Sequence, residues 1–186
     1  MGDCYIDNAR NKLVTLFLGS DCTDMIFVDN DLSFDNDAML KLLKLPCQVV
    51  GGAYPYRGEQ EGYPVSIKQD AKGTPIGNVD LGIIETTHIP TGLMRIRRDV
   101  FTILREKHPE IIDDKNEYKY FRTGLLFVDQ GDRRYYGEDV SFCKICCDAG
   151  IKVWCEPRIT FGHIGRTGKI GNFDTYLRAN ATQKTG

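Results

Sequence analysis

The chain has 186 residues, of which 41% are hydrophobic and 27% charged, and its formal net charge is -2. This length suits a single domain, and the charge excludes a global positive field that would draw the chain to nucleic acid or anionic lipid. Its apolar runs span only a few residues, far short of the roughly 20 that a membrane helix needs, so we expect no membrane span.

Helices and strands alternate in the first half of the chain. A helix is predicted over residues 9–20, and a short apolar run over 25–29 predicts a buried, central strand that ends in acid. A second helix is predicted over 35–45 and a second buried strand over 47–54. Residues 55–80 are rich in Gly, Pro and charge, which indicates a surface excursion.

The second half mixes helices with extended segments. The elements predicted there are strands over 81–89, 117–122, 124–130, 152–157 and 159–165 and helices over 97–109 and 137–150. The segment after Gly165 is rich in Gly, Thr, Lys and Asn, and we expect it to be mobile without ligand. This pattern predicts an α/β sandwich around a mixed sheet.

Seven cysteines raise the question of zinc or disulfides. Cys143, Cys146 and Cys147 fall at helical spacing, whereas a zinc site usually draws on two separated pairs. We predict buried, reduced thiols without zinc. The odd count and the lack of a secretion signal favour a reducing compartment, so we expect the protein in the cytoplasm.

The segment FVDNDLSF carries the strongest local signal. Asp29 and Asp31 lie at the carboxyl end of a predicted strand, where open α/β sheets bind ligands. Carboxylates two residues apart on a turn can face one hard cation, such as Mg²⁺ or Mn²⁺. The alternative is a solvated turn in which Asp31 caps the next helix.

Two further segments carry groups suited to catalysis or metal binding. Glu138 and Asp139 begin a predicted helix, where one of them could accept a proton from a hydroxyl, or both could simply cap the helix. His163 lies between glycines after a predicted strand, and a neutral imidazole beside two carboxylates would suit Mn²⁺, although a structural role is open. Arg166 and Lys169 follow and could close over phosphates.

Two loops complete the candidate set. Gly52 ends the second predicted buried strand, where its lack of a side chain would let the backbone approach a ligand, and Tyr54 nearby could stack or hydrogen-bond. Thr91 and Gly92 form a turn before an apolar stretch, for which plain loop geometry is the alternative.

The order of these motifs resembles a known family. The segments are ARN, VDNDLSF, GGAYPYR, IPTGLMRIRRDVF, GEDVSFC and GIKVWCEPRITFGHIG. Together they resemble GT-A-fold glycosyltransferases similar to family 2, especially the compact forms of phages and large viruses. The resemblance spans about residues 8–165 and implies one GT-A-like domain, a sandwich around a mixed, mainly parallel sheet, with residues 166–186 as a tail.

The resemblance also implies roles for individual residues. Asp29, Asp31 and His163 would hold a divalent cation, Mn²⁺ or Mg²⁺, and the diphosphate of the sugar donor. Asp139 would be the catalytic base of an inverting reaction, with Glu138 beside it. The residues implied to contact the sugar donor or line its pocket are Arg10, Asn30, Thr91 and Gly92.

The implied activity is metal-dependent transfer of a sugar from a nucleoside-diphosphate sugar to a hydroxyl of a glycan, a protein or a hydroxymethylated DNA base. The arginines available for DNA phosphates are Arg95, Arg97, Arg98, Arg133 and Arg134, for which a solvated surface is the alternative. A non-catalytic nucleotide-sugar or carbohydrate-binding domain is the second hypothesis. A nucleotidyltransferase would ordinarily show a Gly-rich, basic loop near its start, which this sequence lacks.

One departure from the family concerns the start of the chain. The family usually opens with a strand and loop that bind the nucleotide base, whereas only Met1 to Asn8 precede ARN here. We therefore expect the usual first strand to be lacking. If this start is native, a partner chain or a homo-oligomer could complete the nucleotide site.

Overall fold

The computed structural model describes residues 5–57, 60–113, 115–128, 132–165 and 168–183. Within these ranges the strands are β1 (Asp24–Val28), β2 (Leu32–Phe34), β3 (Val49–Gly52), β4 (Ser66–Ile67), β5 (Gly77–Asn78), β6 (Ile83–His88), β7 (Leu93–Arg97), β8 (Gly124–Val128), β9 (Asp132–Tyr136), β10 (Val153–Glu156), β11 (Thr160–His163) and β12 (Lys169–Asn172). The helices are α1 (Ile6–Leu18), α2 (Ala38–Lys44), α3 (Arg98–Lys107), α4 (Glu138–Asp148) and α5 (Phe173–Gln183), with a 3₁₀ turn at Pro109–Ile111.

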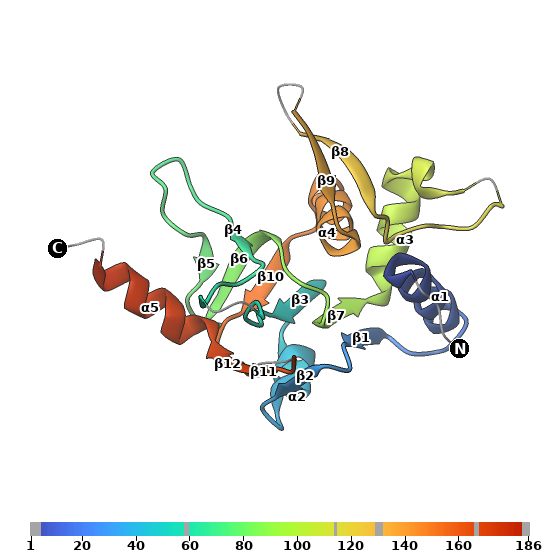
Figure 1. The fold of residues 1–186 in the computed structure, drawn as a ribbon. Coiled ribbons are helices and arrows are strands. Elements are labelled where there is room, and N and C mark those ends of the chain that lie inside the picture. Colours follow the sequence, from blue (N-terminus) through green and yellow to red (C-terminus); the bar gives the residue numbers. More distant parts are fainter. Residues whose placement is uncertain (1–4, 58–59, 114, 129–131, 166–167, 184–186) are drawn as a thin grey trace.

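A seven-stranded mixed sheet forms the centre of the fold (Figure 1). Its order is β1-β7-β3-β10-β6-β4, with β5 also paired to β6. Within the described ranges, β3 and β10 pair in parallel and the other pairings of this sheet are antiparallel. The prediction of a mainly parallel sheet is therefore wrong. The antiparallel pairings are those of β7 with β1 and β3, and those of β6 with β10, β4 and β5.

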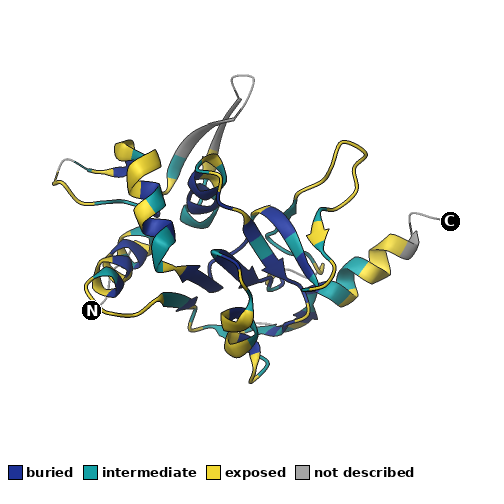
Figure 2. Cartoon of the chain, turned by 180° about the vertical axis from the view of Figure 1, so that it is seen from behind, coloured by how far each residue is buried: buried dark blue, intermediate teal, exposed yellow. Residues whose placement is uncertain are grey.

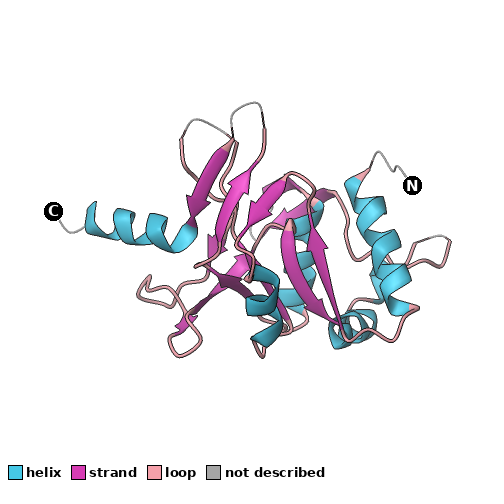
Figure 3. Ribbon diagram, turned by 90° about the horizontal axis from the view of Figure 1, so that it is seen from below, coloured by secondary structure: helices cyan, strands magenta, loops and turns pink. Residues whose placement is uncertain are grey.

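Helices cover both faces of this sheet (Figure 3). On one face, α1, α3 and α4 contribute Val14, Phe101 and Phe142 to the larger apolar cluster. On the other face, α2 and β11 contribute Leu42 and Phe161 to a second cluster. Neighbouring residues of one strand serve opposite faces, and on β3 Val49 joins the first cluster whereas Val50 joins the second. The buried residues accordingly concentrate along the central strands (Figure 2).

A second, three-stranded sheet has the order β12-β11-β2 and is antiparallel. Its register places His163, the last residue of β11, opposite Leu32 of β2 and Lys169 of β12. The backbone N–H of Ile164 also donates to the carbonyl oxygen of Asp31 at 2.8 Å. Residues about 130 positions apart in the sequence are thereby held together.

Several segments differ from the sequence prediction, among them β7, for which the sequence analysis predicts no strand. The strand predicted over 117–122 is a loop in which only Tyr118 bridges to Ile112, because Tyr120 and Phe121 turn into the core instead of joining a sheet. The expected mobile tail contains β12 and α5. Phe173 at the start of α5 is buried and packs against Tyr63 with ring centroids 4.8 Å apart.

Most cysteines whose environment is described are buried free thiols. Cys143, Cys146 and Cys155 are fully buried, and burial raises the pKa of each thiol. Cys143 and Cys146 lie on the inner side of α4, as their helical spacing predicts. Cys22 is exposed.

Glu85 of β6 is a buried carboxylate, 3% exposed, held by Lys68 Nζ at 2.7 Å and Lys152 Nζ at 3.2 Å. Burial alone would raise the pKa of Glu85, but the hydrogen bonds and charges of the two lysines outweigh it, so the pKa lies below its ordinary value of 4.5. A lowered pKa in the folded state stabilises the fold above the ordinary pKa, and this stabilisation is lost as the pH falls through the folded pKa.

We therefore expect Glu85→Gln to lower the free energy of unfolding by about 1–3 kcal/mol at pH 7, and the difference from the parent to shrink towards pH 3. Urea denaturation at both pH values measures this. Glu106→Gln, on an exposed position of α3, is the control and should differ from the parent by less than about 0.5 kcal/mol. A deficit of the same size at both pH values would contradict the ionised role of Glu85.

Candidate active site

The acidic turn between β1 and β2 occupies the position that the sequence predicts. Asp29 follows the last residue of β1 directly, and Asp31 precedes the first residue of β2. The backbone N–H of Asp29 donates to the carbonyl oxygen of Gly92 at 2.9 Å. This bond joins the acidic turn to the loop that carries Thr91 and Gly92.

Arg10 of α1 links two acidic segments of the chain. Arg10 is only 5% exposed. Its Nη2 lies 3.4 Å from Asp29 Oδ1, and its Nε lies 3.1 Å from Glu138 Oε1. The guanidinium carbon also lies 5.4 Å from the centre of the Phe27 ring, a favourable cation–π position. Arg10 therefore ties α1, the end of β1 and the start of α4 together.

Tyr54, just beyond β3, lies in the middle of this group. The backbone of Gly92 lies close to its phenol group. Burial, with the charges of Asp29 and Asp139, raises the pKa of Tyr54, so the hydroxyl stays protonated at neutral pH. A Cβ atom at Gly92 would lie 2.6 Å from Tyr54 Cε1 and 2.9 Å from Asp29 Oδ2. Only glycine leaves room for both side chains.

The acids at the start of α4 complete this side of the site. Glu138 is the first residue of the helix and Asp139 the second. Burial raises the pKa of Glu138, although the charge of Arg10 opposes this. Asp139 Oδ1 accepts a hydrogen bond from the backbone N–H of Val140 at 2.7 Å. This bond does not distinguish a helix cap from a catalytic base, so both hypotheses stay open.

His163 faces Asp31 on the other side of the site. Its Nδ1 lies 2.7 Å from the carbonyl oxygen of Pro55. Because a carbonyl can only accept, Nδ1 carries the proton and the lone pair of Nε2 is free to accept. Nε2 lies 3.6 Å from Asp31 Oδ2 and accepts from Arg57 Nε at 3.0 Å. Arg57 Nη2 also contacts Asp31 Oδ2.

The predicted metal ligands are brought together only in part. Asp31 and His163 direct an oxygen and a nitrogen lone pair towards one point, and these groups suit Mn²⁺ or Mg²⁺. Asp29 turns instead to Arg10. No group of three or more His, Cys, Asp or Glu side chains in the described ranges has an arrangement that could hold a metal ion. The structure therefore brings together two of the three predicted ligands, and metal binding by this pair stays a prediction.

The remaining predicted residues have diverse surroundings. Asn30 is exposed in the acidic turn. Thr91 is buried, and its Oγ1 finds no hydrogen-bond partner among the described residues. A Cβ atom at Gly52 would lie 2.4 Å from Phe161 Cζ, so packing explains this glycine rather than approach to a ligand. Lys169 lies opposite His163 in the β11–β12 register, and Arg166 lies outside the described residues.

The arginines proposed for DNA phosphates need correction. Arg95 is 1% exposed and donates to the carbonyl oxygens of Cys47, Leu42 and Leu45. Arg98 donates to four carbonyl oxygens at the end of α1 and just beyond it. Both guanidinium groups therefore bind backbone carbonyl oxygens and are not free to contact DNA phosphates. Arg97 is half-exposed and pairs with Asp99, and the side chains of Arg133 and Arg134 lie outside the described part.

Comparison with known proteins gives a fold but no family. The sequence matches no protein-family model and no curated protein. The fold is similar to that of A197 from STIV, known from a crystal structure, with a TM-score of 0.54 and 18% sequence identity over 91% of this chain and 78% of that one. No helix in the described ranges has the length and apolar character needed to cross a membrane.

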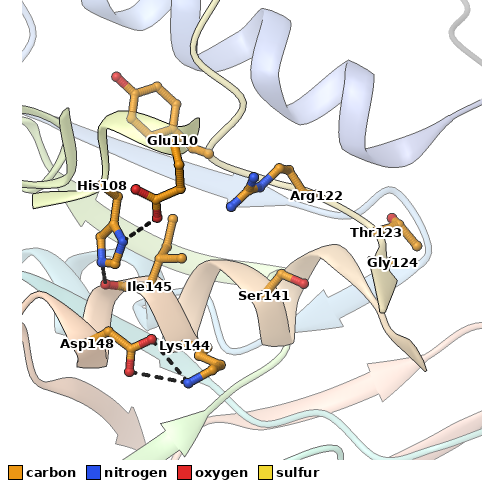
Figure 4. Close-up of a pocket in the computed structure, with 10 residues that line it drawn as sticks. His108, Glu110, Arg122, Thr123, Gly124, Ser141, Lys144, Ile145 and Asp148 are labelled. Carbon is orange, nitrogen blue, oxygen red and sulfur yellow. Dashed lines mark hydrogen bonds and ion pairs between the residues drawn. The ribbon is translucent and has the colours of Figure 1, made fainter. Parts of the chain in front are cut away.

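A separate cavity of about 350 Å³ opens beside α4 (Figure 4). Several of its charged groups already bind one another. His108 lies 2.8 Å from Glu110 and 3.1 Å from the carbonyl oxygen of Ile145, and Lys144 pairs with Asp148 at 3.1 Å. None of the predicted site residues lines this cavity, so it does not enlarge the candidate active site.

Arg57 is the site residue that sequence analysis missed. It stands in the segment GGAYPYR, which the analysis used for its glycine and tyrosine. An arginine in an irregular, charged loop carries no local signal of its own. Only the fold shows that it meets Asp31 and His163.

Proposed function

We propose that this protein is a glycosyltransferase that moves a sugar from a nucleoside-diphosphate sugar to a hydroxyl acceptor. The observation that carries the proposal is the convergence of groups from five separated segments: Arg10, Asp29, Tyr54, Gly92 and the Glu138–Asp139 pair. They meet where β1 ends, and Asp31 and His163 lie beside them.

The charge at the site supports a phosphorylated ligand that arrives with a cation. Asp29, Asp31, Glu138 and Asp139 supply four carboxylates, against two guanidinium groups of Arg10 and Arg57. If all four carboxylates are ionised, the two guanidinium groups offset only two of them. The net charge of -2 that remains would repel a diphosphate. A divalent cation, Mn²⁺ or Mg²⁺ held by Asp31 and His163, would offset them and neutralise the leaving diphosphate.

The chain's own residues suggest the remaining roles. Asp139, the second residue of α4, would accept the proton of the attacking hydroxyl, which would invert the anomeric centre. Tyr54 can donate from its protonated hydroxyl to a bound sugar or phosphate. The acceptor belongs to the class of hydroxyl compounds that includes glycans, proteins and hydroxymethylated DNA bases. For DNA, Arg95 and Arg98 are not available as phosphate contacts.

Binding of the sugar donor tests this proposal. A panel of nucleotide sugars is screened by thermal shift with Mn²⁺ and with a chelator, and the best ligand is followed by calorimetry and product analysis. We expect a rise in melting temperature that follows RT ln(1 + [L]/Kd). Asp29→Ala should weaken binding by about tenfold or more, because the turn then loses a carboxylate and Arg10 its partner.

The control is Asp80→Ala, which removes an exposed acid in a turn and should leave affinity unchanged. If no nucleotide sugar raises the melting temperature and no sugar is transferred, the proposal fails. Binding without transfer or hydrolysis would instead support the second hypothesis, a non-catalytic nucleotide-sugar-binding domain.

A further inference from the structure

Arg57 occupies the point towards which Asp31 and His163 are directed. Its guanidinium contacts Asp31 Oδ2, and its Nε donates to His163 Nε2 at 3.0 Å. The carbonyl oxygen of Pro55 fixes the His163 tautomer, so the Nε2 lone pair given to Arg57 is the one that a metal ion would use. One organic cation thus occupies the Nε2 lone pair of His163 and one carboxylate oxygen of Asp31.

We propose that Arg57 is a resident cation that keeps free divalent metal out of the Asp31–His163 pair. This inference rests on the proposed function, because it concerns how that site loads its cation. A guanidinium and a metal ion cannot share these lone pairs, and their like charges repel at such short range. The metal therefore binds only when Arg57 leaves.

The surroundings of Arg57 allow it to leave. Its side chain is 54% exposed, and it stands in an irregular segment between β3 and β4. Its aliphatic stem lies beside Gly165, where a Cβ atom would approach Arg57 Cδ to 3.3 Å. An exposed, unbranched side chain can turn to a new partner at little cost. A diphosphate is such a partner, since guanidinium groups bind phosphate oxygens in a bidentate manner.

Metal binding and arrival of the sugar donor would then be coupled. Without a phosphorylated ligand, Arg57 stays on Asp31 and His163 and the metal affinity is low. When the ligand is present, Arg57 binds its diphosphate instead. The lone pairs of Asp31 and His163 that Arg57 leaves can then bind the metal. The coupling is reciprocal, so the metal also raises affinity for the sugar donor.

Mn²⁺ titration of the whole chain, without nucleotide, tests the proposal by electron paramagnetic resonance of free Mn²⁺. We expect Arg57→Ala to bind Mn²⁺ at least about tenfold more tightly than the parent, a difference of about 1.4 kcal/mol. The double variant Arg57→Ala/His163→Ala should lose this gain. Arg178→Ala is the control: it removes an arginine that is 78% exposed and paired with an aspartate of α5, and it should bind like the parent.

Equal Mn²⁺ affinity of the parent and Arg57→Ala, or a gain that survives in the double variant, would overturn the proposal. Arg57→Gln gives the same measurement in a variant of similar shape should Arg57→Ala not fold. Because the probe is Mn²⁺ alone, this result is separate from the nucleotide-sugar screen. The screen can fail while Arg57 still controls the metal, and the reverse also holds.

Discussion

Asp139→Asn should lower the rate of sugar transfer by about 10²- to 10⁴-fold and leave the affinity for the sugar donor nearly unchanged. The carboxylate is the expected proton acceptor, and the amide has the same shape without the basicity. Asn also keeps an oxygen that can accept from the N–H of Val140, the bond that Asp139 makes at 2.7 Å. Stability should therefore fall by no more than about 1 kcal/mol.

Asp148→Asn is the matched control, because it makes the same substitution at the exposed, far end of the same helix. Single-turnover transfer, calorimetry with the sugar donor and thermal melts are compared for the three proteins. A variant that folds, binds the sugar donor and transfers at nearly the parent rate would show that Asp139 only caps α4. The next base to test would be Glu138, whose burial raises its pKa.

Arg95→Met should lower the free energy of unfolding by about 3–5 kcal/mol, the largest stability effect that we expect from a single substitution here. The guanidinium lies inside the fold, where Nη1 donates to Cys47 at 2.6 Å and Nη2 to Leu45 at 2.6 Å. It also reaches Asp24 at 3.2 Å. Methionine fills much of the volume but leaves these carbonyl oxygens and the carboxylate without their donor.

Urea denaturation at pH 7 measures the loss, and Arg97→Met is the control two residues along the same strand. Arg97 is 47% exposed and pairs with the half-exposed Asp99, so its replacement should cost at most about 1 kcal/mol. If both variants lost the same small amount, Arg95 would contribute no more than a surface ion pair does. Because Arg95 holds the residues that follow α2, the variant should also loosen that helix.

Elements with a strong local pattern were predictable from the sequence. α3 and α4 lie close to their predicted bounds because each carries an apolar face, and the apolar run of β3 identifies a buried strand. The prediction that residues 25–29 form a central strand is wrong, because β1 lies at the edge of the sheet and only its Phe27 is buried. The strand order was not predictable. β7 is rich in arginine, and its inward-facing Arg95 breaks the apolar signal of a central strand. When β7 is not recognised as a strand, β1 and β3 resemble neighbouring parallel strands.

The candidate site was predictable where a residue stands at the end of a regular element. Asp29, Glu138 and His163 all occupy such positions, and the fold brings them to one region. Contacts that depend on packing were not predictable. Phe161 fills the space beside Gly52, and Arg57 reaches Asp31 from an irregular loop. No local pattern encodes either contact, because both partners are distant in the sequence.

The central position of β10 has a consequence for synthesis of the protein. β10 lies between β3 and β6, although about 65 to 100 residues separate it from them in the chain. A nascent chain emerging from the ribosome cannot close its sheet until β10 has left the exit tunnel, and such distant pairings form slowly. Until then, β3 and β6 would each expose an unpaired edge, and unpaired strand edges promote aggregation. His163, seven residues beyond β10, would join the site at the same late stage.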